Sequence, residues 1–308
     1  MTTEARARLI FPFAIPIAIL AVSTASIFIR FSQGYGAPSL VIAALRLTFA
    51  TLILTPVALT KHLDEIKRFT QTEILLGVFS GIFLAVHFAT WITTLEYTSV
   101  ASSVVFVATG PLWVAMLSPM LLKEHLARTA IIGLVLSIVG GAIIGLSDAC
   151  TWAGGLSCPD LQDIMQGRAM WGNFLALAGA WSVTGYLIIG RKLRAGMSLV
   201  PYIFLVYGMA SIALIIIMFV SGNTPFGYAP KTYGWILLLA ILPQLVGHST
   251  YNWALRYLPA ALVAVTTLGE PIGSAILAFF LLNETPAVTT IIGGLFILTG
   301  IYLASRSK

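Results

Sequence analysis

Charged side chains are scarce in this sequence of 308 residues. It has 17 lysines and arginines and 11 aspartates and glutamates, which together make up 9% of the chain. A typical soluble domain has about 25% charged residues, so a water-soluble surface cannot be built from this composition. The net charge of +6 is no sign of nucleic-acid binding, because the bases gather in the short connections between apolar runs.

Motifs for catalysis and for nucleotide hydrolysis are absent as well. The sequence has no glycine-rich phosphate-binding loop, no H-E-x-x-H pair and no nucleophile elbow. This argues against ATP-driven pumping by the chain alone, and we expect no catalytic residue and no cofactor. The two cysteines, Cys150 and Cys158, have no histidine near them, so no metal site is expected either.

Long apolar runs are what the chain has in abundance, with 58% hydrophobic residues and a mean hydropathy of +0.97. About 20 apolar residues are needed for a helix to cross the hydrocarbon core of a bilayer. Ten runs meet this length: 11–31, 38–59, 73–95, 100–122, 129–147, 171–190, 199–220, 233–255, 260–282 and 287–304. The sequence therefore predicts an all-α membrane protein with ten transmembrane helices.

Lysines and arginines are distributed unevenly between the two sides of these helices. With the N-terminus placed inside, 13 of the 17 fall in inner segments, while Arg30, Arg168 and Lys231 fall in outer ones and Arg46 lies within a span. Basic residues concentrate in cytoplasmic loops. We therefore expect both termini in the cytoplasm, with the protein in a bacterial inner membrane.

The second half of the chain repeats landmarks of the first at one constant offset. The matching pairs are Tyr97 and Tyr257, Pro111 and Pro271, Glu124 and Glu284, Gly133 and Gly293, and Gly140 and Gly300. Each half has five helices, an odd number, so the second copy enters the membrane from the opposite side. We predict two inverted five-helix repeats, 1–147 and 171–308, joined by an extracytoplasmic loop, 148–170. Inverted repeats indicate alternating access around a site near the bilayer midplane.

The two cysteines both lie in this predicted outer loop, where disulfides can persist. Cys150 and Cys158 are close together in the sequence and either form a disulfide or remain two free thiols. The sequence leaves both alternatives open.

Several local motifs occur in order and in duplicate. Pro38-Ser39-Leu40 leads to Ala43-Ala44-Leu45-Arg46, and Gly110-Pro111-Leu112-Trp113 leads to Leu121-Leu122-Lys123-Glu124; the second half has Glu270-Pro271 followed by Leu282-Asn283-Glu284. Over nearly the whole chain this pattern resembles the EamA-type exporters of the drug/metabolite transporter superfamily. The resemblance implies export of amino acids or related small metabolites, and it does not specify which one.

Two charged residues lie within the predicted helices, Arg46 in the second and Glu270 in the ninth. A charge at the bilayer centre costs about 2.5–3.5 kcal/mol on insertion scales, so each requires a reason. Glu270 either contacts a substrate amine, carries a coupled proton or serves as a buried structural partner. Arg46 either binds a substrate carboxylate, reaches out to the interface or pairs with Glu270.

Polar residues form related stripes in the third and eighth predicted helices. Gln244, His248 and Asn252 recur at every fourth position, so they share one helix face. In the third helix, His87 occupies nearly the same place in the first repeat as His248 does in the second, and Trp91 follows it one turn later. Such stripes either line a transport pathway or bond neighbouring helices together. Their presence in both halves favours the pathway.

Deep aromatic residues are further candidates for the wall of a substrate pocket, although packing or lipid contact is the alternative for each. Besides Trp91, the candidates are Trp113, Trp181, Trp253, Tyr186, Tyr207 and Tyr251.

Prolines at matching places predict breaks in the fourth and ninth helices, because proline lacks the backbone N–H that an unbroken helix needs. Pro111 follows Gly110, and Pro271 occupies the matching place in the second half.

We therefore expect a secondary transporter that exports small organic metabolites, above all amino acids or aromatic and apolar metabolites. The alternatives are a multidrug, nucleotide-sugar or other metabolite exchanger of the same superfamily and, from a different class, an intramembrane enzyme acting on lipid. The expected partners are a small-molecule substrate and the lipid bilayer. A proton or counter-substrate as the driving partner, and a monomer or a homodimer as the assembly, are left open.

Overall fold

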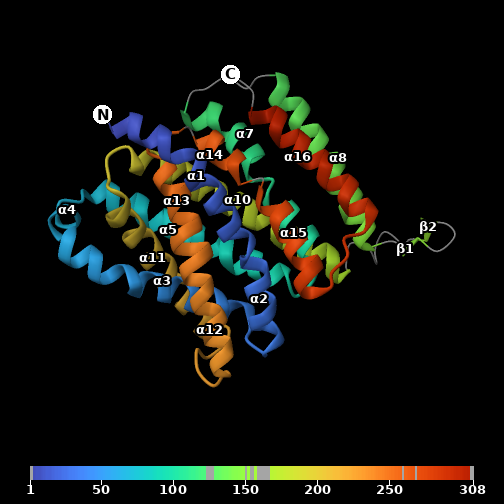
Figure 1. Cartoon of the computed structure of the whole chain (residues 1–308), viewed down its shortest axis with the longest axis horizontal. Helices are drawn as coiled ribbons and strands as arrows, with labels where there is room; N and C mark the ends of the chain where they lie inside the picture. Colours follow the sequence, from blue (N-terminus) through green and yellow to red (C-terminus); the bar gives the residue numbers. More distant parts are fainter. Residues whose placement is uncertain are drawn as a thin grey trace.

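The computed structural model describes residues 3–122, 128–149, 151–152, 156–157, 167–258, 260–267 and 269–305, and these are almost wholly helical (Figure 1). The first half consists of α1 (Thr3–Ser23), α2 (Ala25–Gly34), α3 (Ser39–Lys61), α4 (Leu63–Lys67), α5 (Gln71–Thr94), α6 (Val100–Val107), α7 (Gly110–Leu122) and α8 (Arg128–Ala149). A short antiparallel ribbon follows, β1 (Thr151–Trp152) and β2 (Leu156–Ser157). The second half consists of α10 (Arg168–Arg194), α11 (Leu199–Val220), α12 (Pro230–Leu239), the π-helix η1 (Ala240–His248), α13 (Ser249–Ala254), α14 (Ala260–Thr266), α15 (Gly269–Leu282) and α16 (Val288–Ser305).

Within the described residues, six helical stretches are long and apolar enough to cross a membrane. They are Ile10–Gly34, Ser39–Lys61, Gln71–Thr94, Val100–Leu117, Arg168–Arg194 and Leu199–Val220, and shorter apolar helices add Ile131–Ile144, Gly269–Leu282 and Val288–Gly300. The prediction of a helical membrane protein is confirmed. The total of ten spans, the inverted topology and the side on which the termini lie stay predictions. Cys150 and Cys158 lie outside the described residues.

The surface and the interior of the bundle have the polarity expected of a protein dissolved in lipid. Phe13, Met120, Val220 and Phe280 are each more than 70% exposed. Arg46, in contrast, is fully buried, and so are several amide and hydroxyl side chains. Lipid solvates apolar side chains as well as the protein interior does, whereas charged groups need partners or water inside the bundle.

The fourth and ninth predicted helices are each interrupted just before a proline. Residues 100–122 form α6 and α7, with Pro111 as the second residue of α7. Residues 260–282 form α14 and α15, with Pro271 as the third residue of α15. Proline cannot donate to the preceding turn, and it fits the first turn of a new helix, where its missing N–H is not needed.

Threonine hydroxyls satisfy backbone carbonyls at both interruptions. Thr109 donates to the carbonyl of Phe106, and Thr267 donates to the carbonyl of Ala264, each at 2.7 Å. A break within the membrane is tolerated when side chains bond the carbonyl groups that the helix no longer uses. The two halves therefore share the same means of stabilising their breaks.

The eighth predicted helix, 233–255, contains the π-helix η1 between α12 and α13. Pro243 lies inside η1. A π-helical stretch is wider than an α-helix and is frequent at functional sites. It also changes the direction in which the following side chains point.

The two halves tie their first helix to their third in the same way. In the first half, Gln33 of α2 donates from Nε2 to the carbonyl of Ile92 in α5, at 3.2 Å. In the second half, Arg194 of α10 donates from Nε to the carbonyl of Asn252 in α13, at 2.9 Å. The two acceptors, Ile92 and Asn252, are the same number of positions apart in the sequence as the repeat mates Tyr97 and Tyr257. The two donors are one position further apart than that. The repeat seen in the sequence is therefore also a repeat of contacts.

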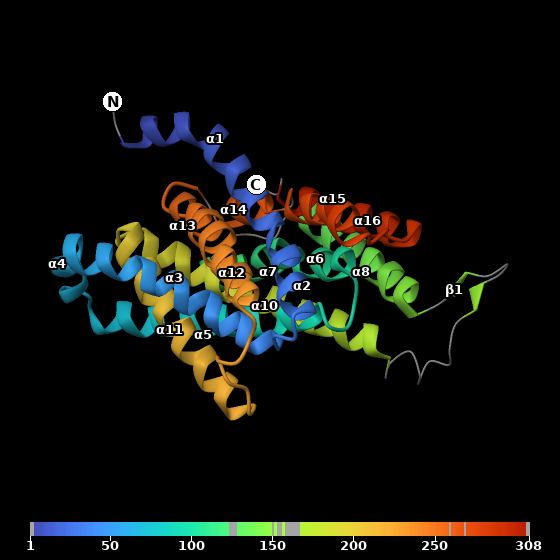
Figure 2. The ribbon, with the colours of Figure 1, turned by 60° about the horizontal axis from the view of Figure 1, so that its bottom comes forward.

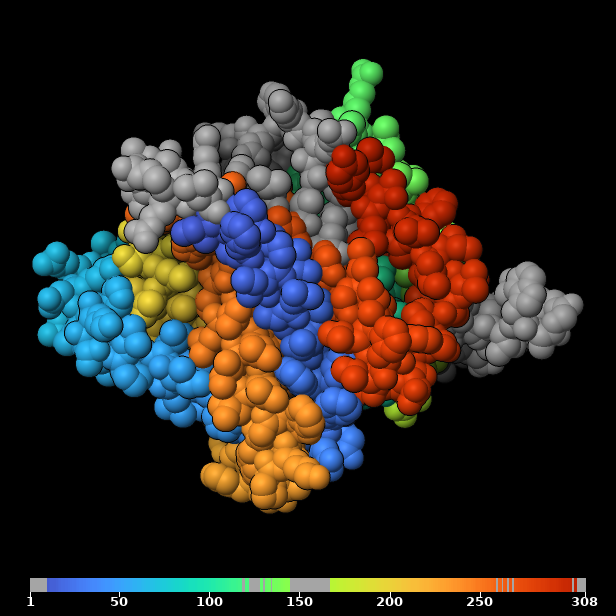
Figure 3. Space-filling model, viewed as in Figure 1, coloured from blue at the N-terminus to red at the C-terminus, as the bar shows by residue number. Residues whose placement is uncertain are grey.

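Helices from the two halves pack directly against each other. Of the first half, α3 contacts α11, α5 contacts α10 and α11, and α1 contacts both η1 and α15. Figure 3 shows α1 in the groove between the segment that holds η1 and α13 and the segment that holds α15. Figures 1 and 2 place the start of α1 and the end of α16 on one side of the bundle. The turns after α2 and α11 lie on the other side.

The most extensive contact between the halves is that of α8 with α16, which run alongside each other (Figure 2). Gly140 and Gly293 meet backbone to backbone, so that a Cβ added at Gly140 would lie 2.5 Å from the carbonyl oxygen of Gly293. Real Cβ atoms do not approach other atoms so closely. Only glycine at both positions lets the two helices come this near.

Candidate functional site

A cavity of about 60 Å³ lies where the two interrupted helices meet. It is lined by His87, Trp91, Val104, Val107, Ala108, Gly110, Pro111, Val183, Tyr186, Leu187, His248, Tyr251, Ala264, Thr267 and Glu270. A water molecule needs about 10–15 Å³ of such space, whereas pockets for drug-sized ligands measure about 300–1,000 Å³. In this conformation the cavity has room for a few waters, and a metabolite would require the helices around it to move apart.

Both helix breaks contribute directly to the wall of this cavity. Gly110 and Pro111 line it from the first half, and Thr267 and Glu270 line it from the second. Pro271, the next residue, is buried but does not line the cavity. Equivalent parts of the two repeats therefore face one shared space.

Arg46 of α3 is fully buried and only partly bonded, and neither it nor its partner Gln244 lines this cavity; Phe88, over which Arg46 lies, contacts the cavity residue His248. Its Nε donates to Oε1 of Gln244 in η1 at 3.0 Å, and its guanidinium carbon lies 4.0 Å from the ring centre of Phe88. The remaining nitrogens, Nη1 and Nη2, have no hydrogen-bond partner, and neither does Nε2 of Gln244. A buried cation is costly unless acceptors surround it, so these free donors indicate a place for an acceptor group.

Glu270 lies in the first turn of α15 and reaches the cavity. It interacts electrostatically with Arg46. The two side chains nevertheless form no ion pair within 4.0 Å; among the described residues, the ion pairs are Arg30 with Glu284 and His62 with Glu65. The direct pairing of Arg46 with Glu270, one of the alternatives from the sequence, is not formed. The carboxylate and the guanidinium remain separate groups that a ligand could contact.

The two predicted histidines both line the cavity. His87 is buried, and its Nδ1 lies 2.9 Å from the carbonyl oxygen of Gly179, which holds the ring in place. The same ring stacks on Trp91 with centroids 5.9 Å apart. His248 meets Phe88 edge to face at 5.4 Å. Within the described part of the chain, no group of three or more histidine, cysteine, aspartate or glutamate side chains could hold a metal ion.

Asn252 and Tyr207, which were also predicted, belong to a network behind the cavity. Nδ2 of Asn252 donates to the hydroxyl of Tyr186 and, at 3.2 Å, to the hydroxyl of Tyr207. The hydroxyl of Tyr207 in turn lies 3.3 Å from that of Ser249. Of these side chains only Tyr186 lines the cavity, so Asn252 and Tyr207 act on it through a neighbour.

Tyr186 and Tyr251, two of the deep aromatic residues considered from the sequence, line the cavity. The hydroxyl of Tyr251 and Nε1 of Trp91 are buried without a hydrogen-bond partner. These two groups add further unused donors to the wall.

Trp113 and Trp181, predicted to wall the substrate pocket, do not line this cavity. They contact each other edge to face at 5.5 Å, and Trp181 is 43% exposed. On α10, Tyr186 faces the cavity, and a residue five positions earlier points about 140° away from it. Trp113 instead lines a separate apolar pocket of about 270 Å³ between α6, α7, α8, α10 and α16. Neither tryptophan is part of the candidate site.

The sequence of this protein matches the pattern of a known family. The sequence pattern of the EamA-like transporter family fits twice, over residues 12–146 and again over residues 170–306. The chain belongs to the EamA-like transporter family. The resemblance seen in the sequence is thereby confirmed, and this EamA-like chain is a transporter rather than an enzyme.

Relatives of this EamA-like transporter are similar over most of their length. Two are described as uncharacterized transporters of Archaeoglobus fulgidus, one 23% identical over 95% of both chains and one 25% identical over 70% of both. The uncharacterized transporter YdfC of Bacillus subtilis is 21% identical over 87% of this chain and 82% of its own. A solved structure of 17% sequence identity superimposes with a TM-score of 0.65 over 94% of each chain, which shows a shared fold.

Proposed function

We propose that this protein is a secondary transporter that exports small organic metabolites, with amino acids as the leading class, across a bacterial inner membrane. In this proposal 1–147 and 171–308 are inverted repeats, 148–170 is extracytoplasmic and both termini are cytoplasmic. The substrate binds at the cavity between the two helix breaks, and the cavity opens to each side in turn.

The partly bonded guanidinium of Arg46 is the observation that carries the substrate class. It offers Nη1 and Nη2, both buried and without partners, behind Phe88 and His248, and the cavity wall that includes His248 also holds the acid Glu270. An opening of the cavity would have to expose these nitrogens to the substrate. Arginine binds carboxylates through two parallel N–H groups, which matches the α-carboxylate of an amino acid. Glu270 is available for the α-ammonium group, and either it or a counter-substrate couples transport to a gradient.

The wall between these two charges favours a substrate with an apolar or aromatic side chain. Trp91, Tyr186 and Tyr251 surround the cavity with aromatic rings, and His87 stacks on Trp91. Aromatic faces pack against apolar groups and against other rings. Aromatic amino acids therefore have all three matching groups: a carboxylate for Arg46, an ammonium group for Glu270 and an aromatic side chain for the wall.

Alternating access is supported by the way in which the halves share this cavity. Gly110 and Pro111 contribute one helix break and Glu270 contributes the other, so a movement at either break changes the cavity. In transporters with inverted repeats, such broken helices lie at the substrate site near the midplane. The cavity has room for a few water molecules and is too small for a metabolite, as expected of the site in a closed conformation.

Counterflow in proteoliposomes tests this function. Purified protein is reconstituted, the vesicles are loaded with one unlabelled amino acid at a time, and entry of the labelled compound is followed. We expect exchange of aromatic amino acids, lost in Arg46→Gln and retained in Trp181→Phe, whose side chain lies outside the cavity. If organic cations or nucleotide sugars exchange and no amino acid does, the amino-acid proposal is wrong while the transporter class stands.

A further inference from the structure

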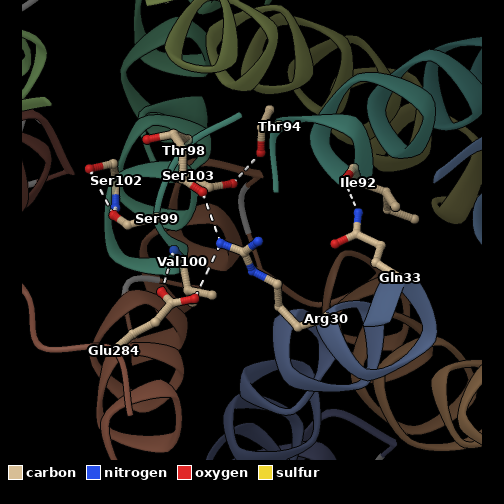
Figure 4. Close-up of polar contacts among 10 residues, drawn as sticks. All are labelled: Arg30, Gln33, Ile92, Thr94, Thr98, Ser99, Val100, Ser102, Ser103 and Glu284. Carbon is tan, nitrogen blue, oxygen red and sulfur yellow. Dashed lines mark hydrogen bonds and ion pairs between the residues drawn. The ribbon is translucent and has the colours of Figure 1, made fainter. Parts of the chain in front are cut away.

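An ion pair joins the two halves on the side of the bundle away from the start of α1 (Figure 4). Nη2 of Arg30, near the end of α2, lies 3.2 Å from Oε1 of Glu284, which follows α15. The same nitrogen donates to the backbone carbonyl of Thr98 at 3.0 Å. Arg30 thus holds the turn between α5 and α6 and the end of α15 together.

The second oxygen of Glu284 makes a different bond. Oε2 accepts from the backbone N–H of Val100, the first residue of α6, at 3.0 Å. A carboxylate at the N-terminus of a helix satisfies a free backbone donor and is favoured by the helix dipole. An acid from the second half therefore caps a helix of the first.

The backbone before Glu284 turns the carboxylate toward α6. Asn283 has a φ of 56°, in the left-handed region that asparagine enters more readily than most residues. The N–H of Glu284 then bonds back to the carbonyl of Ala278 at 3.2 Å. The position of the carboxylate is set by the end of α15 and moves with that helix.

Both helices that meet at Glu284 also reach the substrate cavity. Val104 and Val107 of α6 line it, and Glu270 in the first turn of α15 lines it from the other half. The eight residues of α6 span about 12 Å from Val100 to the break. The contacts of Glu284 thus fasten the far ends of the two helices that flank the cavity on this side.

A second hollow of about 490 Å³ lies at these contacts. Arg30, Glu96, Thr98 and Glu284 are among the residues that line it, together with Ser99, which caps α6. Both members of the ion pair are partly exposed, at 27% and 28%. The pair therefore lies between a hollow with polar walls and the smaller internal cavity, with α6 connecting the two.

The corresponding arginine in the second half is Arg191, and the repeat mate of Glu284, Glu124, lies outside the described residues. Arg191 of α10 matches Arg30 in the repeat to within a single position, and its Nη1 donates to the carbonyl of Leu255 at 2.6 Å, in the turn after α13. In the part of the chain that the structure describes, Arg191 has no carboxylate within ion-pair distance.

We propose that the contact of Arg30, Glu284 and the N-terminus of α6 is the latch of one gate, closed here and broken in each transport cycle. Opening this side requires the end of α15 to leave α2 and α6, and both oxygens of Glu284 must then exchange their partners for water. The latch is an inference about gating and holds for any substrate of the cavity.

Labelling of a cysteine inside the cavity tests the latch. Val104→Cys is introduced after Cys150 and Cys158 are replaced by serine, and a membrane-impermeant maleimide is added to each side of oriented vesicles in turn. We expect Glu284→Gln and Arg30→Gln to raise the labelling rate from the Glu284 side about fivefold, the population shift expected from losing a partly exposed ion pair. Arg168→Gln, on an exposed arginine that bonds the carbonyl of Glu96 and lies over Tyr97, should leave the rate unchanged.

A charge reversal distinguishes the latch from general loosening of the fold. The double variant Arg30→Glu with Glu284→Arg should bring labelling back toward the starting rate, although the arginine cannot cap α6. A cysteine pair at positions 30 and 284, joined by a cleavable bifunctional thiol cross-linker about as long as the two side chains it replaces, should stop exchange, and cleavage of the linker should restore it. Unchanged labelling in both single variants, or full exchange by the cross-linked pair, would overturn the proposal. Either result leaves the transport function itself untouched.

Discussion

Arg46 and Gln244 join the two halves of the protein through one buried hydrogen bond, from Nε to Oε1 at 3.0 Å. This bond fixes the plane of the guanidinium and leaves its two terminal nitrogens without partners. The arginine is therefore held in place by the protein at one nitrogen and is free for a ligand at the others. The following predictions concern this site and the packing around it.

Arg46→Lys should reduce amino-acid exchange by about tenfold or more. Lysine keeps the positive charge, but its ammonium cannot donate to Gln244 and also present two parallel N–H groups to a carboxylate. Initial rates over a range of substrate concentrations give the effect on KM and on the maximal rate. Activity equal to that of the wild type would show that charge alone suffices there.

Glu270→Gln should remove the dependence of transport on a proton gradient, while counterflow of substrate, which needs no gradient, should continue at a reduced rate because the contact with the α-ammonium group is weakened. The amide has nearly the same shape as the carboxyl group but has no ionisable proton to take up and release. Uptake is measured with and without an imposed gradient in wild-type and variant vesicles. Equal gradient dependence in both proteins would exclude Glu270 from coupling.

Trp91→Phe should weaken substrate binding more than Trp181→Phe does. Trp91 lines the cavity and stacks on His87, whereas Trp181 is 43% exposed and does not line it. We expect KM to rise about threefold to tenfold in the first variant and to stay the same in the second. A larger effect at Trp181 would place the site on the other face of α10.

Gly293→Val should destabilise the protein by about 1–3 kcal/mol, the usual cost of overpacking. A Cβ at Gly293 would lie 2.6 Å from the carbonyl oxygen of Gly140, so α8 and α16 must separate. Thermal unfolding in detergent gives the change in Tm, expected to be several degrees. Gly234→Ala is the matched control, because a Cβ there meets no atom within 4 Å and should have no such effect.

Much of the helix pattern could be predicted because hydropathy alone encodes it. The run 199–220 coincides with α11, and the proline after Gly110 indicated where the fourth helix is interrupted. The π-helix around Pro243 was not predicted, since its composition does not differ from that of an ordinary apolar helix. The π-helical backbone is seen only in the structure, where η1 packs against α1 and α3.

The residues of the candidate site were likewise only partly predictable from the sequence. Glu270 and the two histidines could be selected from the sequence because polar groups in a membrane must face the bundle interior or water. Tryptophan carries no such restriction, since its ring suits lipid and protein equally well. Choosing Trp91 over Trp181 requires the rotation of each helix about its own axis, which neither hydropathy nor the repeat supplies.

The glycine contact between α8 and α16 has a consequence for synthesis in the membrane. The first of these helices ends one half and the second ends the other, so the ribosome finishes α8 long before its partner exists. Until then the small-residue face of α8 is covered by lipid or by a neighbouring helix. Close packing of this pair is thus a late event of biogenesis, and a nascent chain released before residue 288 would lack the helix that completes the bundle.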